Sequence, residues 1–395
     1  MSNNPMTSFA AVVRCMYYCL VTPGCLPPLA WGAPGEAKTS VMNALAQRLD
    51  LPMETLIASI CDPTDIGGAL WPDGDRVKRL PMEWAMRLIE QGGGILFLDE
   101  VSTAPPAVQA ALLRLVLEGV AGDTKLTNVR FAAAANPPEQ AAGGHEQSDS
   151  MANRFVHLTW PGPDVSEWSE YMLSGATVVD NLPTFDQQAW DRQLPLSRAL
   201  IAAFLSKRAP LFRESPDKAR GRFPMAIATP RTWDAAARLH ATLTVFGDND
   251  NKTRLLGGCV GEGAATELVS YERKSDLPDV EALLKKPDSW TPDPKRPDRT
   301  FAVVLMVAAA ATQQQFKKGP GGDPVADTKL YSERWESAWR VMGRTMEEGK
   351  DLVVVGARML AKARPQGNSA MLKPEVQSII AELVGVVRES GLMAS

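Results

Sequence analysis

Three short apolar runs constrain the fold of this chain more than any other feature. LAWG at 29–32 predicts a strand that ends at a glycine loop. ILFLD at 95–99 is a continuous apolar run, typical of a strand buried on both faces, and RFAAAANP at 130–137 predicts another buried strand. Stretches with apolar residues at helical spacing follow the first two runs, TSVMNALAQRLD at 39–50 and PAVQAALLRLVLEG at 106–119. The alternation predicts βαβ units and a parallel sheet covered by helices.

The chain of 395 residues changes character after Pro161. Residues 195–245 predict helices, most clearly in PLSRALIAAFLSKRA and PRTWDAAARLHATLTVF. A proline- and charge-rich tract at 275–300 predicts a linker or an extended arm, and KKGPGGDP at 317–324 is a second break. The apolar run at 301–311 is too short to span a bilayer, so we expect a buried helix there.

Composition excludes several classes of protein. A hydrophobic content of 45%, a charged content of 22% and a net charge of -4 describe an ordinary globular chain without a global nucleic-acid footprint. The apolar start FAAVVRCMYYCLV carries Arg14 in its middle and lacks a clear cleavage site, so we expect no signal peptide. Five cysteines without a C-x-x-C pair favour buried free thiols over a zinc site, and a cytoplasmic location.

The segment WGAPGEAKTS at 31–40 nearly matches a phosphate-binding loop, with Ala37 in place of the last glycine. Such a loop works because consecutive backbone N–H groups point at the phosphate from the start of a helix. Lys38 would reach the β- and γ-phosphates of ATP, and the Thr39 hydroxyl would bind Mg²⁺. The methyl group of Ala37 is tolerable if that residue keeps a negative φ. A plain strand-to-helix turn with an exposed lysine is the alternative. The residues expected to hold the nucleotide are Gly32, Ala33, Pro34, Gly35, Glu36, Ala37, Lys38, Thr39 and Ser40.

Two adjacent carboxylates, Asp99 and Glu100, lie at the carboxyl end of the strand predicted at 95–99. At the carboxyl edge of a parallel sheet, Asp99 is suited to hold Mg²⁺ and Glu100 to polarise a water beside the γ-phosphate. Asn136 ends the next predicted strand and could orient the same water. Taken alone, the acidic pair could instead cap the following helix, and Asn136 could belong to a turn.

Together these motifs resemble the AAA+ ATPases, and within them the MoxR-like branch, over residues 28–240. Alanine before the lysine is common in that branch, so the resemblance implies that Ala37 is not a sign of decay. The markers are GAPGEAKTS, DPTDIGG at 62–68, GGGILFLDEVSTAPPAVQAALLRLVLEG, GDTKLTNVRFAAAANPPE, ANRF at 152–155 and ATPRTW at 228–233.

The resemblance assigns roles to two arginines. Arg154 matches the family's arginine finger, which reaches the γ-phosphate held by a neighbouring subunit, and Arg231 matches the sensor arginine of the helical lid. The chain departs from the family at Asn153, where an aspartate usually precedes the finger. A site shared between subunits implies a ring, most often a hexamer.

The resemblance implies an αβα core followed by a helical lid, which we place at 28–165 and 166–275. From composition we expect an N-terminal segment at 1–27, a linker or arm at 276–300 and a helical region at 301–395, which matches no known family. Trp71 in ALWPDGDRV could face a pore or a partner, but we expect simple packing. Trp335 and Trp339 lie four positions apart on one helical face, for which core packing is expected.

The resemblance implies an ATP- and Mg²⁺-dependent, chaperone-like remodeller that acts on a protein client. In the MoxR-like branch such proteins often act with a von Willebrand A domain partner. A nucleotide-gated assembly scaffold with slow turnover is the alternative. A DNA-acting motor is less favoured, although KLTNVR at 125–130 and KKPDSWTPDPKRPDR at 285–299 supply basic residues with one tryptophan.

Overall fold

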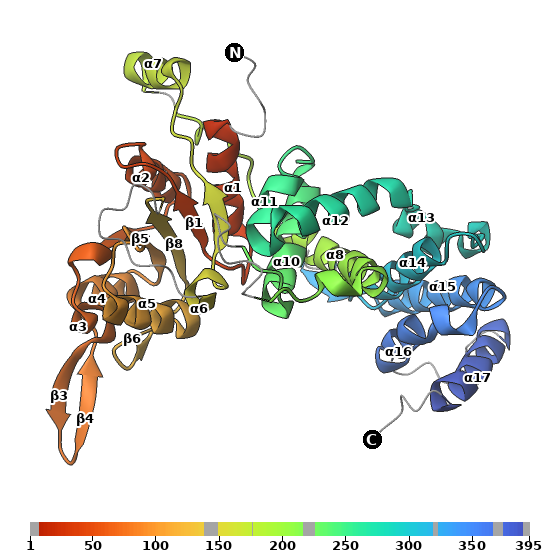
Figure 1. Cartoon of the computed structure of the whole chain (residues 1–395). Helices are drawn as coiled ribbons and strands as arrows, with labels where there is room; N and C mark the ends of the chain where they lie inside the picture. The colour runs from red at the N-terminus through yellow and green to blue at the C-terminus, as the bar shows by residue number, and fades with distance from the viewer. Residues whose placement is uncertain are drawn as a thin grey trace. The chain divides into compact units, whose positions relative to one another are not determined.

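The structure, a computed structural model, describes residues 8–137, 149–175, 177–215, 226–318, 323–365 and 374–389. Parts of the predicted N-terminal segment, lid and second break therefore lie outside the described residues. The chain divides into two compact units, shown in Figure 1, which are described separately below. The first comprises residues 1–186 and 210–266, and the second comprises 187–209 and 267–395.

The first unit is built on a five-stranded sheet in the order β2-β5-β8-β1-β9. Every neighbouring pair is parallel, and Trp31 at the end of β1 lies opposite Ala135 and Thr159. The predicted α/β core with a parallel sheet is confirmed. The strand bounds are β1 Pro28–Trp31, β2 Met53–Ile57, β5 Gly94–Asp99, β8 Val129–Ala135 and β9 Val156–Thr159.

The two strands that the sequence predicted to be buried, β5 and β8, lie inside this sheet. Ile95, Leu96, Phe97 and Leu98 of β5 have no exposed surface, and the alanines at 132–135 of β8 are equally buried. Strands buried on both faces have no polar side to alternate with, which explains the unbroken apolar sequence. Because β1, β5 and β8 run in the same direction, their carboxyl ends meet at one edge of the sheet.

Helices and two short hairpins, β3–β4 and β6–β7, complete the described part of the first unit. Helix α1 is almost entirely buried on β1, β8, β9 and α10, so the apolar N-terminal segment is part of the core. The bounds are α1 Phe9–Val21, α2 Lys38–Arg48, α3 Pro63–Gly67, β3 Ala69–Asp73, β4 Arg76–Leu80, α4 Glu83–Glu90, α5 Pro106–Glu118, β6 Val120–Ala121, β7 Thr124–Lys125, α6 Asp149–Ala152, α7 Val165–Ser174, α10 Pro230–Phe246 and α11 Lys252–Val260.

The second unit is mainly helical, as predicted for the C-terminal region. Its centre is α14, which contains the run expected to form a buried helix, and Trp335 and Trp339 pack in this core with their rings 5.7 Å apart. Core packing of the tryptophan pair is confirmed. The bounds are α8 Gln187–Lys207, α12 Glu262–Ser275 (which starts in the first unit), α13 Val280–Lys285, α14 Pro297–Ala311, β10 Phe316–Lys318, β11 Pro324–Ala326, α15 Thr328–Met346, α16 Val354–Lys362 and α17 Pro374–Glu389.

The tract expected to form a linker or arm at 276–300 differs in the structure. It contains α13, and Val280, Leu283, Leu284 and Trp290 are buried in the core of the second unit. The prolines and charges concealed this short apolar pattern, because they dominate the composition of the tract.

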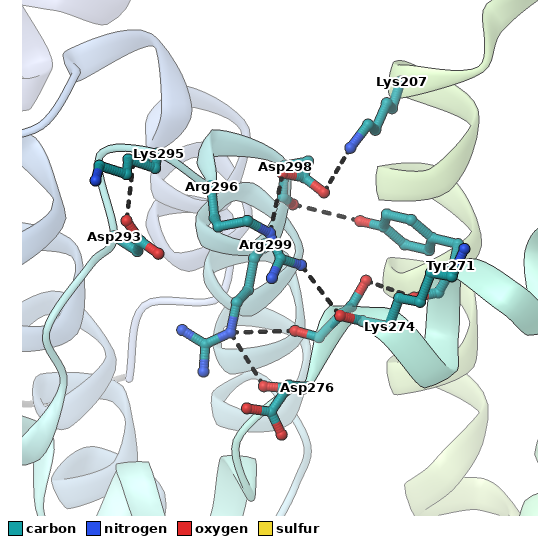
Figure 2. Close-up of polar contacts among 10 residues, drawn as sticks. Lys207, Tyr271, Lys274, Asp276, Asp293, Lys295, Arg296, Asp298 and Arg299 are labelled. Carbon is teal, nitrogen blue, oxygen red and sulfur yellow. Dashed lines mark hydrogen bonds and ion pairs between the residues drawn. The ribbon is translucent and has the colours of Figure 1, made fainter.

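Polar contacts fix the end of this tract, as Figure 2 shows. Arg296 donates to the carbonyl of Lys274, and Nε of Arg299 donates to the carbonyls of Ser275 and Asp276 at 3.1 and 3.0 Å. These two arginines lie at the start of α14, and they donate to carbonyls at the carboxyl end of α12 that the helix itself leaves without a partner. Asp298 accepts from Lys207 of α8 at 2.7 Å, which ties a third helix to the same point.

Helix α8 lies in the second unit, where it packs on α14. The expected lid at 166–275 includes this helix, because sequence order places it there. Small residues decide the packing: Ala199 and Ala203 of α8 meet Ala302, Leu305 and Ala309 of α14. Among the described helices, none is both long and apolar enough to cross a membrane.

Candidate nucleotide-binding site

The loop between β1 and α2 requires glycine at two positions, for different reasons. A Cβ at Gly32 would lie 2.8 Å from the Cβ and the backbone oxygen of Trp160, so only glycine fits. Gly35 has open space around it but a φ of +83°, a conformation that side chains disfavour. The Trp160 indole N–H donates to the carbonyl of Glu36 at 2.7 Å and anchors the loop to the end of β9.

Ala37 does not keep the negative φ that the sequence argument required. Its φ is +59° and its ψ is 18°, in the left-handed region. The first backbone hydrogen bond of α2 runs from Val41 N–H to Ala37 O at 2.9 Å, so the amides of Lys38, Thr39 and Ser40 have no acceptor inside the helix. Ala37 is the residue that precedes α2, so its left-handed conformation sets the turn from the loop into the helix. Holding alanine in this region costs about 1–2 kcal/mol.

Replacing Ala37 by glycine should therefore stabilise the folded chain. The relief of left-handed strain exceeds the entropy that glycine adds to the unfolded state, so we expect the free energy of unfolding to rise by about 0.5–1 kcal/mol. Urea unfolding measures the change. Ala33→Gly is the matched control, because Ala33 has no positive φ, and it should destabilise the chain. Equal effects of the two variants would contradict the assignment of strain to Ala37.

Lys38 lies across the loop instead of extending into solvent, which contradicts the alternative of an exposed lysine. Its Nζ donates to the carbonyls of Gly32 and Ala33 at 2.7 and 2.8 Å and lies 3.5 Å from Oδ1 of Asn136. Burial lowers the pKa of Lys38 from its ordinary value, and the nearby Asp99 carboxylate opposes that shift. Asn136 and Lys38, 98 positions apart, are thus brought together at the end of β8.

The two carboxylates after β5 point to different partners. Oδ2 of Asp99 accepts from the Thr39 hydroxyl at 3.0 Å, whereas the Glu100 carboxylate accepts from the Ser59 hydroxyl. Glu100 has a φ of +56°, and its own N–H donates to Asp99 at 2.9 Å. This left-handed turn directs the two acids apart. The alternative of a helix cap is wrong, since α5 begins at Pro106 and its N-cap residue is Pro105.

Two serines belong to the site that the sequence analysis did not identify. Ser59 follows β2, and its contact with Glu100 depends on β2 lying beside β5. Ser102 exchanges hydrogen bonds with the backbone of Asn136, at 3.2 Å through its hydroxyl and 3.3 Å from the Asn136 N–H. Strand order is the missing information, because a sequence does not show which loops become neighbours.

The residues present fit magnesium and a nucleoside triphosphate. A hydroxyl and a carboxylate oxygen, from Thr39 and Asp99, already face each other as two oxygen ligands of a hard cation would. The three amides at the start of α2 that have no acceptor inside the helix, and the Lys38 ammonium, supply the positive field that phosphate requires. Glu100 lies beside this cluster, and its carboxylate contacts Ser59 instead of Thr39. It therefore does not serve as a magnesium ligand and is suited to accept a proton.

Trp31 and His157, two buried side chains on neighbouring strands, form a hydrogen-bonded pair. The indole N–H of Trp31 donates to Nδ1 of His157 at 2.9 Å, and Nε2 of His157 lies 2.8 Å from the carbonyl of Ala152. A neutral ring protonated on Nε2 satisfies both contacts. Burial lowers the pKa of His157 to about 4, and the hydrogen bond to Ala152 only partly opposes this shift.

His157 should make the stability of the chain depend on pH. Its pKa is about 6.5 in the unfolded chain and about 4 when folded, so acid favours the unfolded state between these values. Stability is fully present above the unfolded pKa and is lost as the pH falls toward about 4. We expect His157 to account for about 2 kcal/mol of unfolding free energy between pH 7 and about pH 5. Urea unfolding at both pH values tests this, and His157→Gln should lose that share of the dependence. An unchanged pH dependence in the variant would contradict it.

The two predicted arginines lie near each other, on the turn after α6 and at the start of α10. Burial lowers the pKa of Arg154, and the charge of Arg231 adds to this shift. Arg154 donates to the Ser150 carbonyl, while its Nε is buried with no hydrogen-bond partner in the part of the chain that the structure describes. Within the described ranges, neither guanidinium hydrogen bonds to the Lys38, Asp99 and Glu100 cluster. Asn153 accepts from the Thr229 hydroxyl at 3.1 Å, and Thr229 caps the helix that carries Arg231.

The loop, the acidic strand end and the parallel sheet define a phosphate-binding-loop protein. Residues 29–155 match the family model of the AAA domain, dynein-related subfamily. The match identifies an AAA domain at residues 29–155, which implies nucleotide binding, and it confirms the predicted AAA+ resemblance for that part of the chain. None of the curated proteins matches the chain.

Solved structures with similarity to the chain include three that differ in coverage. A candidate ATPase from Cytophaga hutchinsonii is 17% identical with a TM-score of 0.37, over 71% of this chain and 89% of its own. NtrX from Brucella abortus is 24% identical with a TM-score of 0.27, over 39% and 37%. A full-length MCM homolog from Methanopyrus kandleri is 18% identical with a TM-score of 0.35, over 68% and 58%. At these scores none of them carries an argument about this chain.

Proposed function

We propose that the chain hydrolyses ATP with Mg²⁺ held by Thr39 and Asp99. The observation that carries this proposal is the cluster of Lys38, Thr39 and Asp99 at the sheet edge, with Glu100 beside it. Magnesium would neutralise charge on the β- and γ-phosphates. Lys38, freed from the loop carbonyls, would bind the same phosphates.

Glu100 supplies the proton acceptor in this proposal. Its carboxylate must exchange the Ser59 hydroxyl for a water before it can take a proton. The hydrogen bond from Ser59 therefore keeps Glu100 inactive until that exchange occurs. Asn136, close to Lys38, is placed to orient that water through its amide. Arg154 of a neighbouring subunit and Arg231 of the same subunit would stabilise the charge on the phosphoryl group.

The same proposal includes a ring, with a hexamer as the expected size, and a MoxR-like remodelling role on a protein client. Ring formation is supported by Arg154, which within the described residues forms no hydrogen bond to Lys38, Asp99 or Glu100 of its own chain, as expected of a finger that serves a neighbouring subunit. A von Willebrand A domain protein is a candidate partner. All five cysteines are free thiols, in keeping with the proposed cytoplasmic location.

A nucleotide-gated scaffold with slow turnover is the second candidate. The contact between Ser59 and Glu100 favours it, because an acid held by a serine is not available to activate water. In that case ATP binding would drive assembly, and hydrolysis would be incidental.

The structure gives no support to a DNA-acting motor. Trp290, the tryptophan of the basic tract, is buried and cannot stack on bases, and Arg296 and Arg299 already bond to backbone carbonyls.

ATP binding is the first test of the proposed function. Calorimetric titration should show binding that strengthens with Mg²⁺, and Lys38→Ala should weaken it by at least tenfold, since a charge-assisted contact to phosphate is lost. Lys125→Ala, an exposed lysine on β7, is the control and should bind normally. Equal binding by Lys38→Ala and the wild type would exclude this loop as the phosphate site.

A further inference from the structure

Helix α7 presents an apolar face that nothing in the described chain covers. None of its residues is buried, and Val165 and Leu173 are 80% and 89% exposed. Val165, Trp168 and Met172 recur at helical spacing on one face, with Tyr171 beside them, and Glu167 and Glu170 lie on the other. Exposed apolar faces of this kind mark interaction sites.

The β3–β4 hairpin is a second such surface in the same unit. All ten of its strand residues are exposed, including Leu70, Trp71 and Val77 at 67%, 59% and 66%. Simple packing of Trp71, which we expected from the sequence, is therefore wrong. Residues 69–80 carry three basic side chains (Arg76, Lys78 and Arg79) against two acidic ones, so the hairpin has a net charge of +1.

The two surfaces lie at opposite ends of the first unit in Figure 1, so one chain does not bring them together. We propose that α7 of one copy docks on the β3–β4 hairpin of a second copy of this chain. This inference rests on the ring in the proposed function and names the surfaces that build it. A contact between two different patches is head-to-tail, the kind that closes into rings.

Charge selects this pairing over the alternatives. Residues 164–175 contain three acidic side chains and no basic one, a net charge of -3, so two α7 helices repel each other. The positive hairpin attracts the same helix, and the apolar side chains of both surfaces become buried together. Aromatic anchors are present on each side, Trp168 and Trp71, as in the centre of stable interfaces.

Photo-crosslinking tests the contact directly. Benzoylphenylalanine in place of Trp168 is introduced into the full chain, which is mixed with isotope-labelled wild type and ATP before irradiation. We expect crosslinked peptides that join position 168 of one copy to residues 69–80 of the other. Crosslinks to another segment, or within one chain only, would overturn the proposal.

Charge reversal gives an independent test by sedimentation velocity. Glu167→Lys with Glu170→Lys should raise the dissociation constant of self-association about tenfold or more, and Arg76→Glu with Arg79→Glu should do the same. Mixing the two variants should restore association between them. Glu347→Lys with Glu348→Lys, two exposed acids of the second unit, is the control and should change nothing. Failure of the mixture to associate better than either variant would overturn the pairing.

ATP turnover measured on the same samples separates the two proposals. Turnover that rises with protein concentration, without a crosslink to the hairpin, would refute this interface and leave the ATPase standing. A crosslink to the hairpin in a chain that never hydrolyses ATP would support the interface and refute the ring ATPase.

Discussion

Arg154→Ala should lower ATP turnover about 10³-fold while ATP affinity stays nearly unchanged. An arginine supplied to the γ-phosphate acts on charge that develops during the reaction, so its loss affects the rate more than binding. The Arg154 guanidinium still has a donor that can bind an external anion. Its Nε is buried and has no hydrogen-bond partner among the described residues, and burial together with Arg231 lowers its pKa.

Mixing experiments show whether this arginine acts between subunits. Arg154→Ala retains its own loop, and Lys38→Ala retains its own finger, so an equimolar mixture contains interfaces with one complete site. We expect the mixture to recover turnover that neither variant has alone. Arg231→Ala is the matched control: a sensor that serves its own nucleotide should give no recovery with Lys38→Ala. A mixture of the first pair no more active than its parts would contradict a finger in trans.

Glu100→Gln should reduce turnover by about 10²–10⁴-fold and retain ATP binding. The amide keeps the size of the side chain and can still contact Ser59, but it cannot take a proton from water. Single-turnover measurements with labelled ATP separate the slow chemical step from binding. Ser59→Ala tests the same acid from the other side, because it frees the carboxylate and should leave turnover equal or faster. Normal turnover by Glu100→Gln would remove this residue from the proposed chemistry.

The sequence predicted the core of the fold because buried strands leave a simple pattern. The runs at 95–99 and 130–137 became β5 and β8 with bounds shifted by a residue or two. Their terminal residues, Asp99 and Asn136, came to one edge because parallel strands share a direction. Local pattern and topology agree here, so local reasoning was sufficient.

Three features could not be predicted because they depend on neighbours in space. The partner of Glu100 is Ser59, which requires knowing that β2 lies beside β5. Ala37 has a positive φ because of the turn between β1 and α2, and alanine as a residue type disfavours that conformation. The burial of Trp290 follows from packing on α14 and α15, against a composition that favours a linker.

The most direct test of the central claim is the rate of ATP hydrolysis per subunit, with Mg²⁺, across a wide range of protein concentration. If Lys38, Thr39, Asp99 and the adjacent Glu100 form an ATPase site completed by Arg154 of a neighbouring copy, the rate per subunit rises steeply with concentration and then levels off. It should be absent without Mg²⁺. A chain that binds ATP but shows negligible turnover at every concentration would contradict the account.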